Sequence, residues 1–166
     1  SKPLLYVPLA TDEKDHPYDS CLEWIKKEMS NTRVSTIEMV KTFEELAEKN
    51  YSSYCAIFIG GGNTYKLLDG LKKSGAFEKI KRYLTEEDGI VYGGSAGAII
   101  FGKDLDSCNT DDENIVGLID NTGFNMIDGY SLLCHYTNRD EEKTNISKEY
   151  LLELSKQKPI YAIPEE

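Results

Sequence analysis

Ser95 lies between glycines in the pentapeptide Gly-Gly-Ser-Ala-Gly at residues 93–97, which fits the Gly-x-Ser-x-Gly pattern of a nucleophile elbow. In an elbow the serine lies on a strained turn between a strand and a helix, and small neighbours let its hydroxyl project from the sheet. The alternative is a helix N-terminus that Ser95 caps, with glycines that allow close packing. The pentapeptide leaves both interpretations open, so other residues must decide between them.

A candidate base for Ser95 comes from one of only two histidines. A serine hydroxyl is a poor nucleophile at neutral pH and needs a base within hydrogen-bond reach, which a third group orients. His16 lies in a polar loop beside Pro17, where an exposed turn residue is expected. His135 follows an apolar run at the end of a predicted strand, where it is either part of the core or poised over a site. We therefore take His135 as the candidate base.

The candidate acids are Asp111, Asp112 and Glu113, which lie in an irregular segment between Ser95 and His135. Acidic loop residues are by default solvated, but one that turns inward would orient the imidazole. Cys134 stands beside His135 and invites a thiol-nucleophile interpretation. Because neighbours on a strand point to opposite faces, we expect Cys134 to belong to the core instead.

Backbone donors for an oxyanion are also available. Acyl transfer needs N–H groups aimed at the developing negative charge, usually one after the nucleophile and one from a nearby loop. Ala96 supplies the first, and Gly61 and Gly62 can supply the second because glycine permits close backbone approach. A phosphate cradle at this Gly-Gly-Gly-Asn-Thr sequence is less favoured, since neither a Walker lysine nor Gly-x-Gly-x-x-Gly spacing accompanies it.

Strand and helix patterns alternate along the chain and would place these residues together. This pattern predicts an α/β fold, a three-layer, doubly wound and mostly parallel sheet with helices on both faces. Ligands of such sheets bind at the carboxyl ends of the strands, where the glycine loop, Ser95 and His135 all fall. The expected strands are residues 4–10, 34–39, 54–59, 90–92, 130–133 and 160–163. The expected helices are 18–29, 43–49, 65–73, 77–85, 147–156 and one from the elbow to about 101. The irregular segment 103–128 offers only residues 115–116 and 118–119 as edge strands.

Composition limits the classes of function. The length of 166 residues fits one domain, and 19 basic against 29 acidic residues give a net charge of −10. This charge argues against nucleic acid and anionic membrane surfaces as partners. Four scattered cysteines and two histidines suggest neither a metal site nor a disulfide framework. With no signal peptide and no apolar run near the ~20 residues of a membrane span, we expect a cytoplasmic protein.

Three pieces of sequence together resemble the peptidase E group of serine peptidases, family S51. They are Ile-Phe-Ile-Gly-Gly-Gly-Asn-Thr at residues 57–64, Gly-Ser-Ala-Gly-Ala at 94–98, and the downstream His135. The resemblance covers nearly the whole chain and implies a fold similar to class I glutamine amidotransferases. It implies Ser95 as nucleophile, His135 as general base and Asp112 as the third member, with Asp111 or Glu113 as the alternatives one residue away.

The family includes an aspartyl dipeptidase and the cyanophycinases. The resemblance therefore implies a serine peptidase of small peptides, in particular dipeptides with an N-terminal aspartate or related acidic or isoaspartyl bonds, without a metal or organic cofactor. A cyanophycinase-like hydrolase or amidase, and a non-catalytic amidotransferase-like binding or sensing domain, are the alternatives. Family members carry further strands at both ends, so we expect residues 1–166 to form a single domain without those flanks, as a monomer or homodimer.

Overall fold

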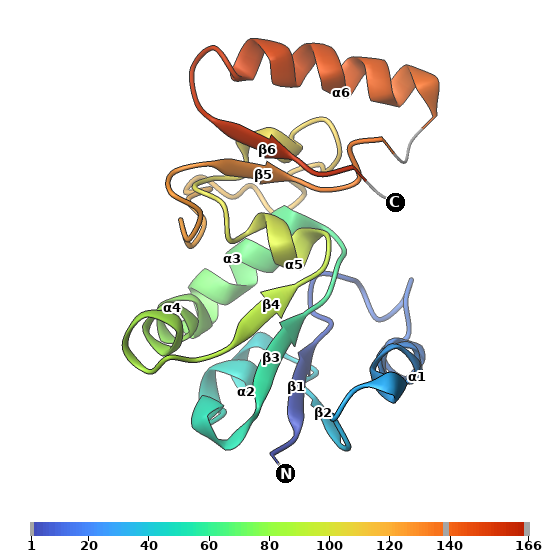
Figure 1. Ribbon diagram of the computed structural model, residues 1–166, viewed down its shortest axis with the longest axis vertical. Coiled ribbons are helices and arrows are strands. Elements are labelled where there is room, and N and C mark those ends of the chain that lie inside the picture. The colour runs from blue at the N-terminus through green and yellow to red at the C-terminus, as the bar shows by residue number, and fades with distance from the viewer. Residues whose placement is uncertain (1, 138–139, 165–166) are drawn as a thin grey trace.

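Strands and helices alternate along the chain, as the hydrophobic pattern predicts (Figure 1). The computed structural model describes residues 2–137 and 140–164. The strands are β1 (Leu4–Val7), β2 (Ile37–Met39), β3 (Ala56–Ile59), β4 (Val91–Gly93), β5 (Ser131–Leu133) and β6 (Ile160–Ala162). The helices are α1 (Tyr18–Glu28), α2 (Phe43–Glu48), α3 (Thr64–Ser74), α4 (Ala76–Glu86), α5 (Ala96–Ile99) and α6 (Glu141–Leu154), with 3-10 turns η1 (Met29–Asn31), η2 (Tyr51–Ser53) and η3 (Asp106–Cys108).

The strands form two parallel sheets. The larger sheet has the order β2-β1-β3-β4, with every neighbouring pair parallel. β5 and β6 form a separate parallel pair that lies beyond the end of the larger sheet and is covered by α6 (Figure 1). The predicted α/β class, mostly parallel strands and helices on both faces are confirmed. The strands are divided between two sheets, and α5 joins them by packing against β3, β4 and β5.

The central strands β1 and β3 are buried on both faces, which explains their continuous apolar sequences. Because side chains alternate along a strand, each strand contributes to two cores. One face packs against α2, α3 and α4, and the other packs against α1 (Figure 1). The first face carries Leu5, Val7, Ile57 and Ile59, and the second carries Leu4, Tyr6, Ala56 and Phe58.

Side-chain caps fix where the helices begin. The Thr42 hydroxyl accepts a hydrogen bond from the backbone N–H of Glu45 at 3.0 Å, so α2 begins at the predicted residue 43. Asn63 caps α3 by accepting from the N–H of Lys66 at 2.9 Å, so α3 starts directly after the glycine loop. Asp140 caps α6 through Lys143 N–H at 2.8 Å, which explains why α6 begins before the predicted residue 147.

The predicted edge strands at residues 115–116 and 118–119 are wrong, because this segment forms turns. The Asn114 side chain binds both the N–H and the carbonyl of Leu118, at 2.8 and 2.9 Å. Such a local side-chain bond competes with strand pairing. Gly117, with a φ of 65°, completes the turn. Val116 and Leu118 still pack against the core, which accounts for their apolar character.

A cluster of charges fastens the irregular segment to the second sheet. Lys158, just before β6, donates hydrogen bonds to Asp104 at 2.6 Å and to Asp106, and Ser131 of β5 donates to Asp104 at 2.8 Å. Burial favours a higher pKa for Asp104, but the hydrogen bonds from Lys158 and Ser131 outweigh it and hold the Asp104 pKa below its ordinary value. This cluster therefore stabilises the fold through the charged form of Asp104.

Replacing Lys158 by methionine leaves Asp104 and Asp106 together without their cation. We expect Lys158→Met to lower the free energy of unfolding by about 2–4 kcal/mol at pH 7, measured by urea denaturation. Because the Asp104 pKa is lowered by folding, its contribution is present above the unfolded pKa of about 4 and is lost as pH falls through the folded value. The difference between variant and wild type therefore shrinks below about pH 4.

Lys156→Met is the matched control, because Lys156 forms an exposed pair with Glu153. We expect it to change stability by no more than about 0.5 kcal/mol. Equal stability of the Lys158 variant and wild type at pH 7 would contradict the role of the cluster.

Candidate active site

Ser95 lies on a strained turn between β4 and α5, with φ 52° and ψ −118°. This conformation is rare for residues other than glycine. The neighbouring glycines are required by close backbone contacts. A Cβ at Gly93 would lie 2.2 Å from the carbonyl oxygen of Gly97, and one at Gly97 would lie 2.1 Å from that of Ile59. The Ser95 side chain makes no capping hydrogen bond to α5, so the local geometry is that of the predicted elbow and not of a capped helix.

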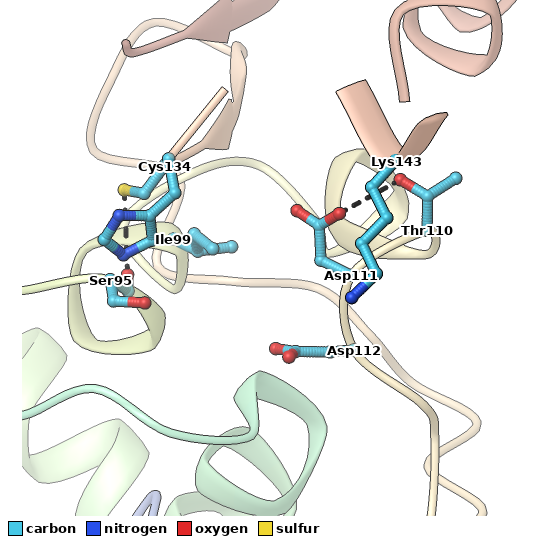
Figure 2. Close-up of a pocket in the computed structure, with 8 residues that line it drawn as sticks. Ser95, Ile99, Thr110, Asp111, Asp112, Cys134 and Lys143 are labelled. Carbon is cyan, nitrogen blue, oxygen red and sulfur yellow. Dashed lines mark hydrogen bonds between the residues drawn. The ribbon is translucent and has the colours of Figure 1, made fainter. Parts of the chain in front are cut away.

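The Ser95 hydroxyl faces a pocket of about 350 Å³ at the junction of the two sheets. In Figure 2, Ser95 and Asp112 point into the pocket from opposite sides, with Asp111 and Lys143 near its rim. The pocket brings together Ser95, His135, Asp111 and Asp112 among the predicted site residues, but Glu113 does not line it. The lining residues are Ser95, Ile99, Thr110, Asp111, Asp112, Cys134, His135 and Lys143.

The glycine loop lies against Ser95, as an oxyanion site requires. A Cβ at Gly61 would lie 3.0 Å from Ser95 Cβ and 3.6 Å from Ser95 Oγ. Gly62 has a φ of 140°, and a Cβ there would lie 2.4 Å from the backbone of Ala10, so only glycine fits. Within residues 2–137 and 140–164, the backbone N–H groups of Gly61, Gly62 and Ala96 donate no backbone hydrogen bond in the loops and turns. These donors can therefore serve a ligand.

The three candidate acids have different surroundings. Oδ2 of Asp112 accepts two hydrogen bonds from Thr64 at the start of α3, one from the backbone N–H at 2.8 Å and one from the hydroxyl at 2.5 Å. Asp111 is exposed and accepts from the hydroxyl of Thr110 at 3.2 Å. Glu113 uses its backbone carbonyl to bind Asn63 at 2.9 Å, and its side chain is exposed. Asp112 is the half-buried acid among the three.

His135 follows β5 and lines the pocket with a φ of 59°. The described part of the chain contains no hydrogen bond that joins His135 to Ser95 or to Asp112. Catalytic hydrogen bonds are often long in ligand-free enzymes and tighten when substrate binds. The pocket thus brings Ser95, His135, Asp111 and Asp112 together, and the described residues show none of the hydrogen bonds that would link Ser95, His135 and Asp112 as a triad.

Cys134 packs against the core, as expected, and it also lines the pocket. Its thiol donates a weak bond to the carbonyl oxygen of Ser95 at 3.8 Å. β5 ends at Leu133, so the strand alternation that would separate Cys134 from His135 no longer applies there. Burial raises the pKa of the Cys134 thiol, which disfavours the reactive thiolate.

Sequence reasoning missed Lys143 and Thr64. Lys143 is the third residue of α6, which begins at Glu141, whereas the predicted helix begins at residue 147. Thr64 belongs to the Gly-Gly-Gly-Asn-Thr motif, but nothing in the sequence shows that its hydroxyl meets Asp112. In the described part of the chain no group of three His, Cys, Asp or Glu side chains is arranged to hold a metal ion.

The geometry defines the class of protein: an α/β fold of parallel strands with a serine at a strand-to-helix elbow. The model of peptidase family S51 matches residues 1–166, and the chain belongs to this family. The resemblance inferred from the glycine loop, the elbow and His135 is therefore confirmed.

Two similar proteins extend the comparison. A crystal structure from Listeria monocytogenes EGD-e, named "Putative Peptidase E Protein", has a TM-score of 0.75 and 27% sequence identity, over 98% of this chain and 78% of that one. "Uncharacterized peptidase PM1590" from Pasteurella multocida (strain Pm70) is 32% identical over 108 residues, which are 63% of this chain. The chain matches about half the length of that relative, 48%. In the described residues, no helix has the length and apolar character that a membrane span needs.

The strain at Ser95 makes a prediction that is independent of activity. At this φ and ψ, Ser95→Gly should be more stable than Ser95→Ala by about 1–3 kcal/mol, because glycine adopts the conformation without steric cost. Urea denaturation of both variants measures the difference. The matched pair Ser20→Gly and Ser20→Ala in α1 should show the opposite order, with glycine less stable by about 1 kcal/mol. Equal stability of the two Ser95 variants would mean that the elbow is not strained.

Proposed function

We propose that the chain acts as a serine peptidase that hydrolyses small peptides, in particular dipeptides with an N-terminal aspartate or related acidic or isoaspartyl bonds. The observation that carries this proposal is the strained Ser95, whose hydroxyl faces a pocket that also contains His135 and two carboxylates. Backbone strain of this kind persists where the surrounding structure enforces it, and it is concentrated at functional sites. Membership of peptidase family S51 supports the same reaction.

In the proposed reaction, the Ser95 hydroxyl attacks the carbonyl carbon of the scissile bond while His135 takes its proton. Backbone N–H groups of Ala96, Gly61 and Gly62 stabilise the oxyanion of the tetrahedral intermediate. His135 then gives the proton to the leaving amine, and an acyl-enzyme ester remains on Ser95. A water molecule, deprotonated by His135, hydrolyses this ester and restores the serine. Asp112 orients the imidazole and stabilises its positive charge.

Lys143 supports a preference for acidic substrates. It is the cation that lines the Ser95 pocket in the described part of the chain. Its amine lies 3.9 Å from Asp140, and its side chain is largely exposed, so this pair holds it only weakly. Figure 2 shows the side chain reaching from α6 toward the pocket beside Asp111. A lysine in this position can bind the side-chain carboxylate of a substrate, while Asp111 favours a free α-ammonium group.

Ser95→Ala tests the reaction. We expect it to lower kcat/KM for Asp-Xaa dipeptides by about 10³-fold or more, since the acyl-enzyme can no longer form. Hydrolysis is followed by chromatography of the released amino acids. A fluorophosphonate probe should label the wild type, and Ser95→Ala and His135→Ala should abolish labelling. His16→Ala, which changes the other histidine, is the matched control and should retain both activity and labelling.

Unchanged turnover in the Ser95 variant would refute the proposal. A wild-type chain that neither hydrolyses peptides nor reacts with the probe would favour the non-catalytic binding or sensing domain. Labelling without hydrolysis of Asp-Xaa dipeptides would favour a cyanophycinase-like hydrolase or an amidase on another substrate.

Lys143→Gln tests the preference for acidic substrates. We expect kcat/KM to fall about tenfold for Asp-Xaa dipeptides, because a charged hydrogen bond to the substrate is lost, and to change less than about twofold for Ala-Xaa dipeptides. Lys148→Gln, an exposed lysine of the same helix, is the matched control and should leave both values unchanged. Equal losses of kcat/KM for both substrates would show that Lys143 does not bind the side-chain carboxylate of the substrate.

A further inference from the structure

Thr64 is a polar residue with no exposed surface, and both of its hydrogen-bond donors go to one atom. The backbone N–H and the hydroxyl of Thr64 both bind Oδ2 of Asp112, at 2.8 and 2.5 Å. Burying a hydroxyl costs free energy unless the hydroxyl is hydrogen-bonded. Here the partner is a carboxylate, and hydrogen bonds to charged groups are stronger than those between neutral groups. The pairing is therefore specific.

We propose that Thr64 is a positioning residue. It holds the Asp112 carboxylate in the orientation in which Oδ1 can accept a hydrogen bond from the imidazole N–H of His135. This inference rests on the proposed peptidase function. Two donors fixed on one oxygen remove the rotation of the carboxylate about its terminal bond. They leave Oδ1 as the oxygen without a hydrogen bond in the described part of the chain, and Asp112 points into the pocket that His135 lines (Figure 2).

The start of α3 is rigid enough for this role. Asn63 caps the helix through Lys66 N–H at 2.9 Å, and its amide donates to the carbonyl of Glu113 at 2.9 Å. Residues 63 and 64 therefore bind two consecutive residues of the irregular segment through three hydrogen bonds. On the other side, the N–H of Asp112 donates to the carbonyl of Cys108 at 2.9 Å, which closes the turn after η3. The acid is thus held from both the helix and its own segment.

The Asp112 carboxylate lies at the N-terminus of a helix and interacts with a buried thiol. The N-terminus of α3 carries a partial positive charge, which attracts an anion placed at its first residue. Asp112 also interacts with the buried Cys108: burial, with the Asp112 charge as a smaller cause, raises the pKa of the Cys108 thiol. The thiol is therefore neutral and does not repel Asp112 at neutral pH.

A merely structural role for the Thr64–Asp112 contact predicts different kinetics. If the contact only anchored the irregular segment to α3, its loss would reduce stability and the amount of active enzyme. If it positions Asp112, its loss also changes the basicity of His135. A well-placed carboxylate stabilises the imidazolium, so a misplaced one lowers the pKa of the base and moves the acidic limb of kcat/KM to lower pH.

Thr64→Val removes the hydroxyl but keeps the shape and the backbone N–H. We expect kcat to fall about 10- to 100-fold, the range of one hydrogen bond to a charged group, with the acidic limb of the kcat/KM profile shifted to lower pH. Thr64→Ser keeps the hydroxyl and should retain both the rate and the profile. Thr85→Val, which removes an exposed hydroxyl from α4, is the matched control and should match wild type. If Thr64→Val does not fold, Thr64→Ala carries the same expectation.

A double-mutant cycle tests whether Thr64 acts through Asp112. In an Asp112→Ala background, Thr64→Val should change kcat by less than about twofold, because the group it positions is already absent. The same loss in both backgrounds, or an unshifted pH profile in Thr64→Val, would overturn the inference. The proposed function fails separately, when wild type and Ser95→Ala hydrolyse peptides equally, and the inference then fails with it. If activity requires Ser95 and Asp112 but is unchanged by Thr64→Val, the inference about Thr64 is refuted and the proposed function stands.

Discussion

The close contact between the elbow and the end of β3 is the constraint on which the site depends. The N–H of Gly94 binds the carbonyl of Ile59 at 3.1 Å, and Gly97 lies so close to that same carbonyl that no side chain fits. These contacts press the turn between β4 and α5 against the glycine loop. As a result Gly61 lies beside the Ser95 side chain. Backbone packing thus fixes the position of the candidate nucleophile relative to its candidate oxyanion donors.

The other half of the site is held by polar contacts between separate parts of the chain. Tyr65 of α3 donates to Asn109, the Asn109 amide donates to the hydroxyl of Tyr150 in α6 at 2.9 Å, and Tyr150 donates to the carbonyl of Asp106 at 2.7 Å. This chain joins both helices to the segment that carries the candidate acids. His135, in contrast, comes from the second sheet. The placement of His135 relative to Ser95 therefore depends on how the two sheets pack, and α5 contacts strands of both.

The sequence predicts best those parts of the structure that depend on local pattern. Continuous apolar runs predict β1 and β3 because both strands are buried on both faces. The start of α2 at residue 43 is predicted correctly, and the Thr42 cap that fixes it is a local bond. The glycines around Ser95 allow both an elbow and a capped helix, and the elbow is favoured only together with the glycine loop and His135. The early start of α6 was missed because its first turns are polar and depend on the Asp140 cap.

Other features depend on contacts between distant residues, which no local pattern reveals. The apolar pairs near residue 116 look like strands, but the Asn114 side chain closes them into a turn. The partner of the Asp112 carboxylate is Thr64, 48 positions away in the sequence. The pocket position of Cys134 depends on where β5 stops pairing. In each case one tertiary or side-chain contact overrides the preference of the segment.

The charge of the chain constrains how the proposed acidic substrates would be recognised. A net charge of −10 repels anions at long range, although salt screens this repulsion beyond about 8 Å at physiological ionic strength. Attraction must therefore come from groups inside the pocket, where Lys143 stands near two carboxylates. An aspartyl dipeptide with a free amino terminus carries charges of both signs and has a partner for each. Among the described lining residues Lys143 is the cation, so a longer acidic peptide would bring more negative charge toward the protein than this lysine can balance, and the proposed site suits small substrates better than polyanionic ones.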